Sequence, residues 1–147
     1  MSMDFAQPTL ELHTHQFIDS LAGAPPIYTL SPAEARSALT RAQSIPVGKP
    51  GAQIEDITLP VGPTGSVPIR ILRPKGTAGV LPVVMYFHGG GWILGDRDTH
   101  DRLVREIAIG VEAAVVFVDY SRAPEARYPI AIEQAYAATR YVARKRR

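Results

Sequence analysis

The stretch that decides the fold is Val83–Asp96, with the sequence VVMYFHGGGWILGD. It opens with five consecutive apolar residues, Val83 to Phe87, and then breaks into His88, three glycines and Trp92. A short run of β-branched and aromatic residues predicts a strand buried on both faces of a parallel sheet. Three successive glycines cost backbone entropy, so their presence at a strand end indicates unusual backbone angles or close approach of the backbone.

The three glycines, Gly89 to Gly91, allow three interpretations. They can form a mobile loop after a core strand, because glycine runs are common in turns. They can cradle a phosphate, but no Gly-Lys-Ser/Thr follows, so the P-loop signature is absent. They can also free peptide N–H groups to bind the oxyanion of an acyl-transfer reaction. A buried strand, His-Gly-Gly-Gly-aromatic and a following helix together resemble the HGGG oxyanion loop of lipases and esterases, and this resemblance favours the third interpretation.

Length and composition indicate one modest folded domain without cysteine chemistry. The 147 residues suffice for a hydrophobic core, and 46% of them are hydrophobic, which excludes a disordered composition. The absence of cysteine excludes disulfides, thiolate zinc sites and a cysteine nucleophile. The N-terminus lacks the features of a secretory signal, and no apolar run approaches the length of a membrane span. We therefore expect a cytoplasmic protein.

The basic balance of the chain comes from its last four residues. The net charge is +2, although Arg144 to Arg147 alone contribute four positive charges, so the remainder is net acidic. The alternative of a nucleic-acid patch is less favoured than a solvated helix end, where cations suit the C-terminal dipole. We predict no nucleic-acid partner.

Residue spacing in the first half predicts two helices and a hairpin. A helix is expected over residues 9 to 22, and a second one starts at the capping box Ser31-Pro32-Ala33-Glu34 and ends before Pro46. Two strands follow, Gln53–Leu59 and Val67–Leu72, joined by a turn-rich segment. The second alternates apolar residues with Pro68 and Arg70, which favours a half-exposed edge hairpin.

The second half alternates helix and strand after the opening stretch. Asp98 or Thr99 is expected to cap a helix, Ala113–Val118 is a strand apolar on both sides, and a last helix starts at Pro129. The apolar faces of these helices are predicted to be Leu103, Val104, Ile107, Ala108 and Val111 in the first, and Ile132, Ala135, Tyr136, Thr139 and Val142 in the second. This order predicts an α/β sheet with right-handed crossovers.

Two motifs carry a resemblance to a known family. HGGGW at 88–92 and DYSRAPEARYP at 119–129, each just after a buried strand, resemble the α/β-hydrolase esterases related to hormone-sensitive lipase. The similarity runs from about Ile54 to Val142. It implies that residues 1–50 are cap helices and a linker, and that residues 51–147 are the N-terminal part of the catalytic domain. It also implies hydrolysis of small carboxylic esters, without a cofactor, by a serine in Gly-x-Ser-x-Gly and an Asp/Glu–His pair.

The resemblance also implies roles for single residues. Gly89, Gly90 and Gly91 form the oxyanion loop, and Gly90 and Gly91 are the expected amide donors. His88 holds this loop by hydrogen bonding and is not the general base. Trp92 walls the substrate pocket, with a buried core indole as the alternative. Tyr120 is the second expected substrate-binding residue.

Several polar residues have competing interpretations. Asp96, Asp98, His100 and Asp101 could suggest a metal site, but helix capping and salt bridging are favoured, and we predict no metal. The second motif departs from the family pattern, Asp-Tyr-Arg-Leu-Ala-Pro-Glu, because Ser121 and Arg122 replace its arginine and leucine. Its glutamate, Glu125, resembles a buried structural carboxylate and not a general acid.

The sequence contains no Gly-x-Ser-x-Gly around any of its serines, which are Ser2, Ser20, Ser31, Ser37, Ser44, Ser66 and Ser121. It therefore resembles the N-terminal part of an esterase, without the catalytic triad, and we expect this chain alone to be inactive. The alternatives are a non-catalytic fragment or binding module, and one half of a split esterase. In the family the Val83–Phe87 strand sits centrally, beside the nucleophile strand. Here it is expected to be an edge strand, open to self-association or to a complementing C-terminal piece.

Overall fold

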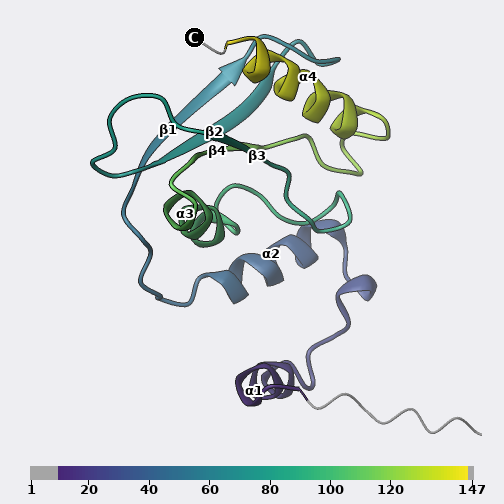
Figure 1. Cartoon of the computed structure of the whole chain (residues 1–147). Helices are drawn as coiled ribbons and strands as arrows, with labels where there is room; N and C mark the ends of the chain where they lie inside the picture. Colours follow the sequence, from purple (N-terminus) through teal and green to yellow (C-terminus); the bar gives the residue numbers. More distant parts are fainter. Residues whose placement is uncertain (1–9, 146–147) are drawn as a thin grey trace, which may run out of the picture. The chain divides into compact units, whose positions relative to one another are not determined.

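The computed structural model describes residues 10–145 (Figure 1). The chain forms two units that divide between Leu30 and Ser31. The first unit contains helix α1 (Leu12–Ser20) and the short 3-10 helix η1 (Ile27–Thr29), neither of which has a buried residue. The helix predicted over residues 9 to 22 is thus confirmed, with residue 9 outside the described part. The expected domain boundary after residue 50 stays a prediction.

The second unit begins with helix α2 (Pro32–Gln43), and its start confirms the predicted capping box. The Ser31 hydroxyl accepts a hydrogen bond from the Glu34 amide at 3.3 Å, and the Glu34 carboxylate accepts one from the Ser31 amide at 2.9 Å. This reciprocal pair satisfies two amides that have no partner within the helix. Pro32 occupies the first helical turn, where its missing N–H has no cost.

Four strands form one mixed sheet in the order β1-β2-β4-β3. They are β1 (Ala52–Leu59), β2 (Val67–Pro74), β3 (Val83–Tyr86) and β4 (Ala114–Val118). The predicted β1–β2 hairpin is antiparallel, and β3 runs parallel to β4. The hairpin lies at one edge of the sheet, as predicted, with β1 outermost and β2 paired on its inner side with β4. Pro68 is tolerated there because the β2–β4 register starts only at Ile69, while the Pro68 carbonyl accepts from the Asp119 amide.

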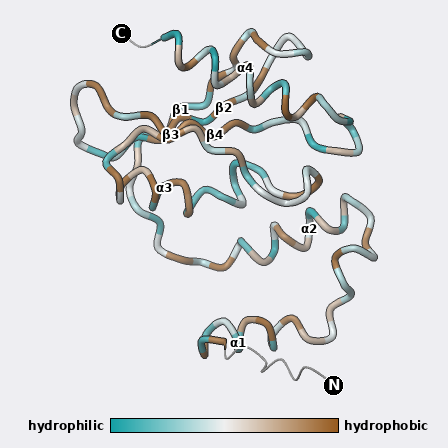
Figure 2. Tube along the Cα trace, turned by 45° about the vertical axis from the view of Figure 1, so that its right-hand side comes forward, coloured by the Kyte–Doolittle hydropathy of each residue, from teal (hydrophilic) through white to brown (hydrophobic). Residues whose placement is uncertain are grey.

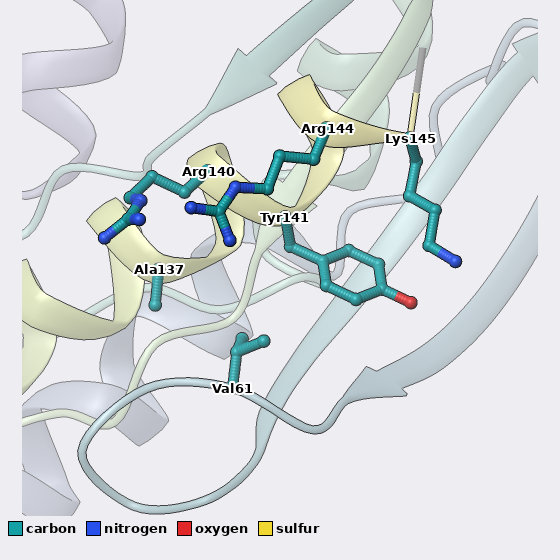
Figure 3. Close-up of a pocket in the computed structure, with 6 residues that line it drawn as sticks. All are labelled: Val61, Ala137, Arg140, Tyr141, Arg144 and Lys145. Carbon is teal, nitrogen blue, oxygen red and sulfur yellow. The ribbon is translucent and has the colours of Figure 1, made fainter. Parts of the chain in front are cut away.

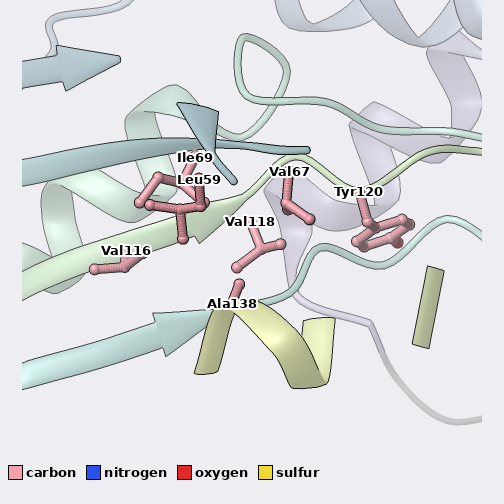
Figure 4. Close-up of a cluster of buried hydrophobic side chains, with 7 residues drawn as sticks. All are labelled: Leu59, Val67, Ile69, Val116, Val118, Tyr120 and Ala138. Carbon is pink, nitrogen blue, oxygen red and sulfur yellow. The ribbon is translucent and has the colours of Figure 1, made fainter. Parts of the chain in front are cut away.

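Helices α3 (Asp101–Gly110) and α4 (Ile130–Arg144) cover opposite sides of this sheet, as Figure 1 shows. Every residue of β4 is buried, and alternate residues face opposite sides. Val115 and Phe117 pack with Val104 and Ala108 of α3. The cluster on the α4 side, drawn in Figure 4, consists of Leu59, Val67, Ile69, Val116, Val118, Tyr120 and Ala138. Hydrophobic residues accordingly gather in the strands at the centre of Figure 2.

Two helix details differ from the sequence-based expectation. The residue before α3 is His100, and its side chain does not cap the helix, so the prediction that Asp98 or Thr99 caps it is wrong. The Asp96 side chain instead accepts hydrogen bonds from the amides of Asp98 and Thr99. On α4, Ile132 and Tyr136 are exposed and the buried residues are Gln134 and Ala138. Alanine allows close approach to the sheet, and the buried amide of Gln134 finds hydrogen-bond partners.

Strand β3 lies at an edge of the sheet, and the expectation that it is buried on both faces is wrong because none of its residues is buried. Within residues 10–145 it pairs only with β4. Val83, at its start, is 49% exposed, and Phe87, directly after its end, is 43% exposed. The expectation that this strand forms an edge here is confirmed by the strand order. None of the helices in the described part is both long and apolar enough to cross a membrane.

Candidate active site

The glycine loop after β3 makes a left-handed turn. Backbone φ is 121° at Gly90, 62° at Gly91 and 59° at Trp92. The Gly90 carbonyl closes the turn by accepting hydrogen bonds from the amides of Ile93, at 3.2 Å, and Leu94, at 2.9 Å. A Cβ atom at Gly90 would lie 2.5 Å from the Leu94 carbonyl oxygen, a separation that non-bonded atoms do not tolerate. Position 90 therefore requires glycine for space as well as for its φ value.

The amides of Gly90 and Gly91 are available to a ligand. No acceptor among residues 10–145 takes a hydrogen bond from either N–H group. Both residues are exposed and line a hollow of about 280 Å³. Its other lining side chains are mainly apolar: Phe87, Trp92, Tyr120, Ala131, Ile132 and Ala135, with His88 behind them. Two backbone donors without an acceptor in the described part, beside an apolar hollow, are what an oxyanion site would need.

His88 lies beneath the loop and anchors it to the core. Its ring is buried between Tyr120, with centroids 4.2 Å apart, and Phe117, at 5.5 Å, and both pairs are nearly parallel. Its Nδ1 is 2.9 Å from the Gly89 carbonyl oxygen, which can only accept, so Nδ1 carries the proton. The Tyr120 hydroxyl donates to the His88 carbonyl at 2.6 Å. Burial lowers the pKa of His88, so the ring is neutral.

These contacts account for where His88 and Tyr120 are placed. Both side chains are buried and hydrogen-bond to the backbone of the loop, at the carbonyls of Gly89 and His88. Tyr120 also borders the hollow. That His88 is not the general base, and that Tyr120 touches substrate, stay predictions. Trp92 is 58% exposed at the rim, so the alternative of a buried core indole is wrong.

Gly95 is a second glycine that the loop requires and that sequence reasoning missed. Its φ is 85°, and a Cβ atom there would lie 2.6 Å from Nδ1 of His88 and 2.9 Å from the Gly89 carbonyl oxygen. The backbone at Gly95 thus packs directly over the histidine hydrogen bond. A signal was present in the sequence, since Gly95 follows the triple glycine at a turn, but its contact with His88 is a tertiary one.

The carboxylates after the loop are engaged in structural contacts. Asp98 pairs with Arg70 at 3.0 Å, and buried Asp101 pairs with Lys49 at 2.8 Å and with Arg105 at 3.0 Å. Asp96 accepts from two backbone amides, as described above. Residues 10–145 hold no group of three metal-ligating side chains. Salt bridging is confirmed for Asp98 and Asp101, and Asp96 lies 3.6 Å from Arg122, whereas His100 forms no salt bridge within the described residues.

In the second motif, the environment of Ser121 depends on Gln134, a residue that sequence reasoning missed. The Gln134 side chain is fully buried; its carbonyl accepts from the Ser121 amide at 2.8 Å, and its amide donates to the hydroxyls of Ser121 and Thr64. This network fixes Ser121 to α4 and to the β1–β2 turn. Within the described residues, the Ser121 hydroxyl bonds to Gln134 and to no histidine or carboxylate that could activate it.

The expectation that Glu125 is buried is wrong. Its side chain is 64% exposed and pairs with Arg36 of α2 through two hydrogen bonds of 2.7 and 2.8 Å. The hydrogen bonds from Arg36 lower the pKa of Glu125 to about 2. A carboxylate that stays ionised at neutral pH cannot donate a proton, which agrees with a structural role.

A larger hollow, of about 750 Å³, lies beside the C-terminal half of α4 (Figure 3). Its lining is Val61, Ala137, Arg140, Tyr141, Arg144 and Lys145. Lys145 and Arg140 lie 5.5 Å from the centroids of Tyr141 and Tyr136 in cation–π geometry. The lining holds no serine, histidine or carboxylate. Arg144 and Lys145 are the described part of the basic tail; Arg146 and Arg147 lie outside the described residues.

Comparison with known proteins assigns this arrangement to a family. A family model for the α/β hydrolase fold matches residues 84–147. Over 108 residues the chain is 43% identical to the carboxylesterase NlhH of Mycobacterium tuberculosis, covering 74% of this chain. A solved thermostable esterase from Pseudomonas putida is 44% identical, covers 96% of this chain and superposes with a TM-score of 0.89. The chain belongs to the α/β-hydrolase fold family.

The match covers only part of these α/β hydrolases. The chain spans 34% of the length of the carboxylesterase and 45% of the solved Pseudomonas esterase. An esterase from Pyrobaculum calidifontis gives the same picture, with 35% identity, a TM-score of 0.81 and 44% of its length covered. The described residues accordingly hold a partial α/β-hydrolase sheet.

The neutral, buried His88 predicts a pH dependence of stability. Its pKa in the folded chain lies below the value of about 6.5 expected in the unfolded chain. The free energy of unfolding is therefore highest above about pH 6.5 and decreases as the pH falls toward the lower pKa of the folded chain. Over this range the unfolded chain binds the proton and the folded chain does not. Thermal unfolding from pH 7.5 to 5.5 should show a falling Tm, and His88→Asn should flatten this dependence. An equal slope in both proteins would contradict a neutral, buried His88.

Proposed function

We propose that this chain supplies the oxyanion-binding half of a carboxylic-ester hydrolase site. The observation that carries the proposal is the pair of amides at Gly90 and Gly91, which border an apolar hollow and have no acceptor among residues 10–145. The esterase relatives support the same chemistry, since the chain aligns with carboxylesterases over most of its length. The substrate class is a small carboxylic ester whose acyl or alcohol group fits beside Trp92.

In the proposed reaction, a serine oxygen attacks the ester carbonyl carbon while its proton passes to a base. The carbonyl oxygen gains the negative charge and accepts hydrogen bonds from the two glycine amides. Each such preorganised donor stabilises the transition state by roughly 3 kcal/mol. Because His88 and Tyr120 hold the loop from below, the donors need little reorganisation when the charge develops. The leaving alkoxide then takes the proton, and water releases the acyl group.

The serine, acid and base of this reaction are proposed to come from residues other than these 147. No serine in the sequence lies in Gly-x-Ser-x-Gly, and Ser121 is fixed in the Gln134 network. A continuation of the same polypeptide or a separate complementing piece would serve equally. The other candidate, a binding module without catalysis, would use the same hollow and no nucleophile.

A chimera tests the proposal. This chain would replace the matched part of the Pseudomonas esterase, which supplies the rest of the fold. We expect the chimera to hydrolyse p-nitrophenyl acetate, and Gly90→Ala to lower kcat on the order of tenfold or more, because the new Cβ displaces the loop. The unmodified 147-residue chain should show no turnover above buffer.

Gly110→Ala is the matched control, since a Cβ atom at Gly110 meets open space at the end of α3. It should leave kcat unchanged. An active chimera whose kcat does not respond to Gly90→Ala would refute the oxyanion assignment. Turnover by the chain alone would show a nucleophile among these residues.

Association through β3 is a second expectation. The strand leaves one row of backbone donors and acceptors without a strand partner in the described part, beside exposed Val83 and Phe87. Such an edge favours pairing with another strand. Light scattering of the chain across a concentration series should show a rising mass, and Met85→Pro, which removes a backbone donor, should reduce it. A constant monomer mass for the unmodified chain would exclude this pairing.

A further inference from the structure

Trp92 has a backbone conformation that its side chain disfavours. Its φ of 59° is left-handed, and it follows left-handed Gly91 in the turn that the Gly90 carbonyl closes. Glycine adopts this region freely, but in other residues the Cβ atom comes too close to the following carbonyl oxygen. A bulky aromatic residue with φ above zero is uncommon, so contacts outside the turn must hold it.

Those contacts come from two distant segments of the chain. The Trp92 carbonyl accepts a hydrogen bond from the Ala123 amide at 2.8 Å. The next carbonyl, that of Ile93, accepts from Nε of Arg36 at 2.8 Å, and Nη2 of Arg36 donates to the Ala123 carbonyl at 2.7 Å. The Ala123 amide joins two segments of the chain, and the Arg36 guanidinium donates to one carbonyl in each of them.

Glu125 holds that guanidinium in place. Its two carboxylate oxygens accept from Nη1 and Nη2 of Arg36, while the Arg36 side chain is only 21% exposed. The planar fork of arginine can direct donors to two carbonyls and one carboxylate together, which a lysine cannot do. Arg36 belongs to α2, so its position is set by a helix 57 residues away from Ile93 in the sequence.

We propose that Arg36 is a positioning residue for the oxyanion loop, holding Trp92 in its left-handed conformation and so fixing the backbone of Gly90 and Gly91, which line the hollow. Without the guanidinium, the Ile93 and Ala123 carbonyls lose their side-chain donor and the turn can relax at Trp92. Rotation of the Gly91–Trp92 backbone would then reorient the neighbouring amides. The catalytic part of this inference rests on the proposed esterase function; the structural part does not.

The native chain offers a direct probe, because Trp92 is its single tryptophan. We expect Arg36→Met to lower the steady-state fluorescence anisotropy of Trp92 in the 147-residue chain, as the turn becomes mobile. Arg41→Met is the matched control, since Arg41 is exposed on the same helix, and it should leave the anisotropy unchanged. Far-UV circular dichroism would verify folding, and Arg36→Lys serves if the methionine variant does not fold. Unchanged anisotropy in the folded Arg36 variant would overturn the proposal.

A double-mutant cycle in the esterase chimera separates positioning from general stability. Arg36→Met should lower kcat about tenfold when residue 92 is tryptophan. With Trp92→Gly already present, the same change should cost about twofold or less, because glycine keeps a positive φ without support. An equal loss in both backgrounds would overturn the positioning role. An active chimera that is insensitive to Gly90→Ala would refute the proposed function but not the structural role of Arg36. The anisotropy of the native chain tests that role without catalysis.

Discussion

The closure of the left-handed turn after β3 is the interaction on which the candidate site depends. The Gly90 carbonyl takes the amides of Ile93 and Leu94, and this is possible only because no Cβ atom stands between Gly90 and Leu94. The Gly90 carbonyl is hydrogen-bonded within the turn, whereas the amides of Gly90 and Gly91 have no acceptor in the described residues. The same geometry that costs backbone energy therefore provides the two donors.

Two groups of contacts from the rest of the second unit support this turn. From below, Phe117 of the buried strand β4 and Tyr120 hold the ring of His88, whose Nδ1 proton binds the Gly89 carbonyl. From the side, the segment after β4 bonds the Trp92 carbonyl through Ala123, and Arg36 bridges both. The hydrophobic core of the sheet thus positions the loop through stacked rings and backbone hydrogen bonds, without contributing catalytic groups itself.

Local patterns in the sequence were sufficient to predict the glycine loop, the Ser31 capping box, the hairpin and the alternation of β3, α3, β4 and α4. They failed where a contact joins distant residues. The fork of Arg36 to Ile93 and Glu125, and the burial of Gln134, depend on which elements meet in space. The buried face of α4 was misassigned because apolar residues were expected inside, whereas the sheet accepts Ala138 and a hydrogen-bonded Gln134.

The central claim is that the amides of Gly90 and Gly91 bind a developing oxyanion. The most direct measurement is a crystal structure of the esterase chimera after reaction with a p-nitrophenyl phosphonate, whose tetrahedral phosphorus imitates the intermediate. The account predicts a phosphoryl oxygen at about 2.7–3.1 Å from the nitrogens of Gly90 and Gly91, with the turn unchanged. A phosphoryl oxygen bound by other donors, with both amides facing elsewhere, would contradict it.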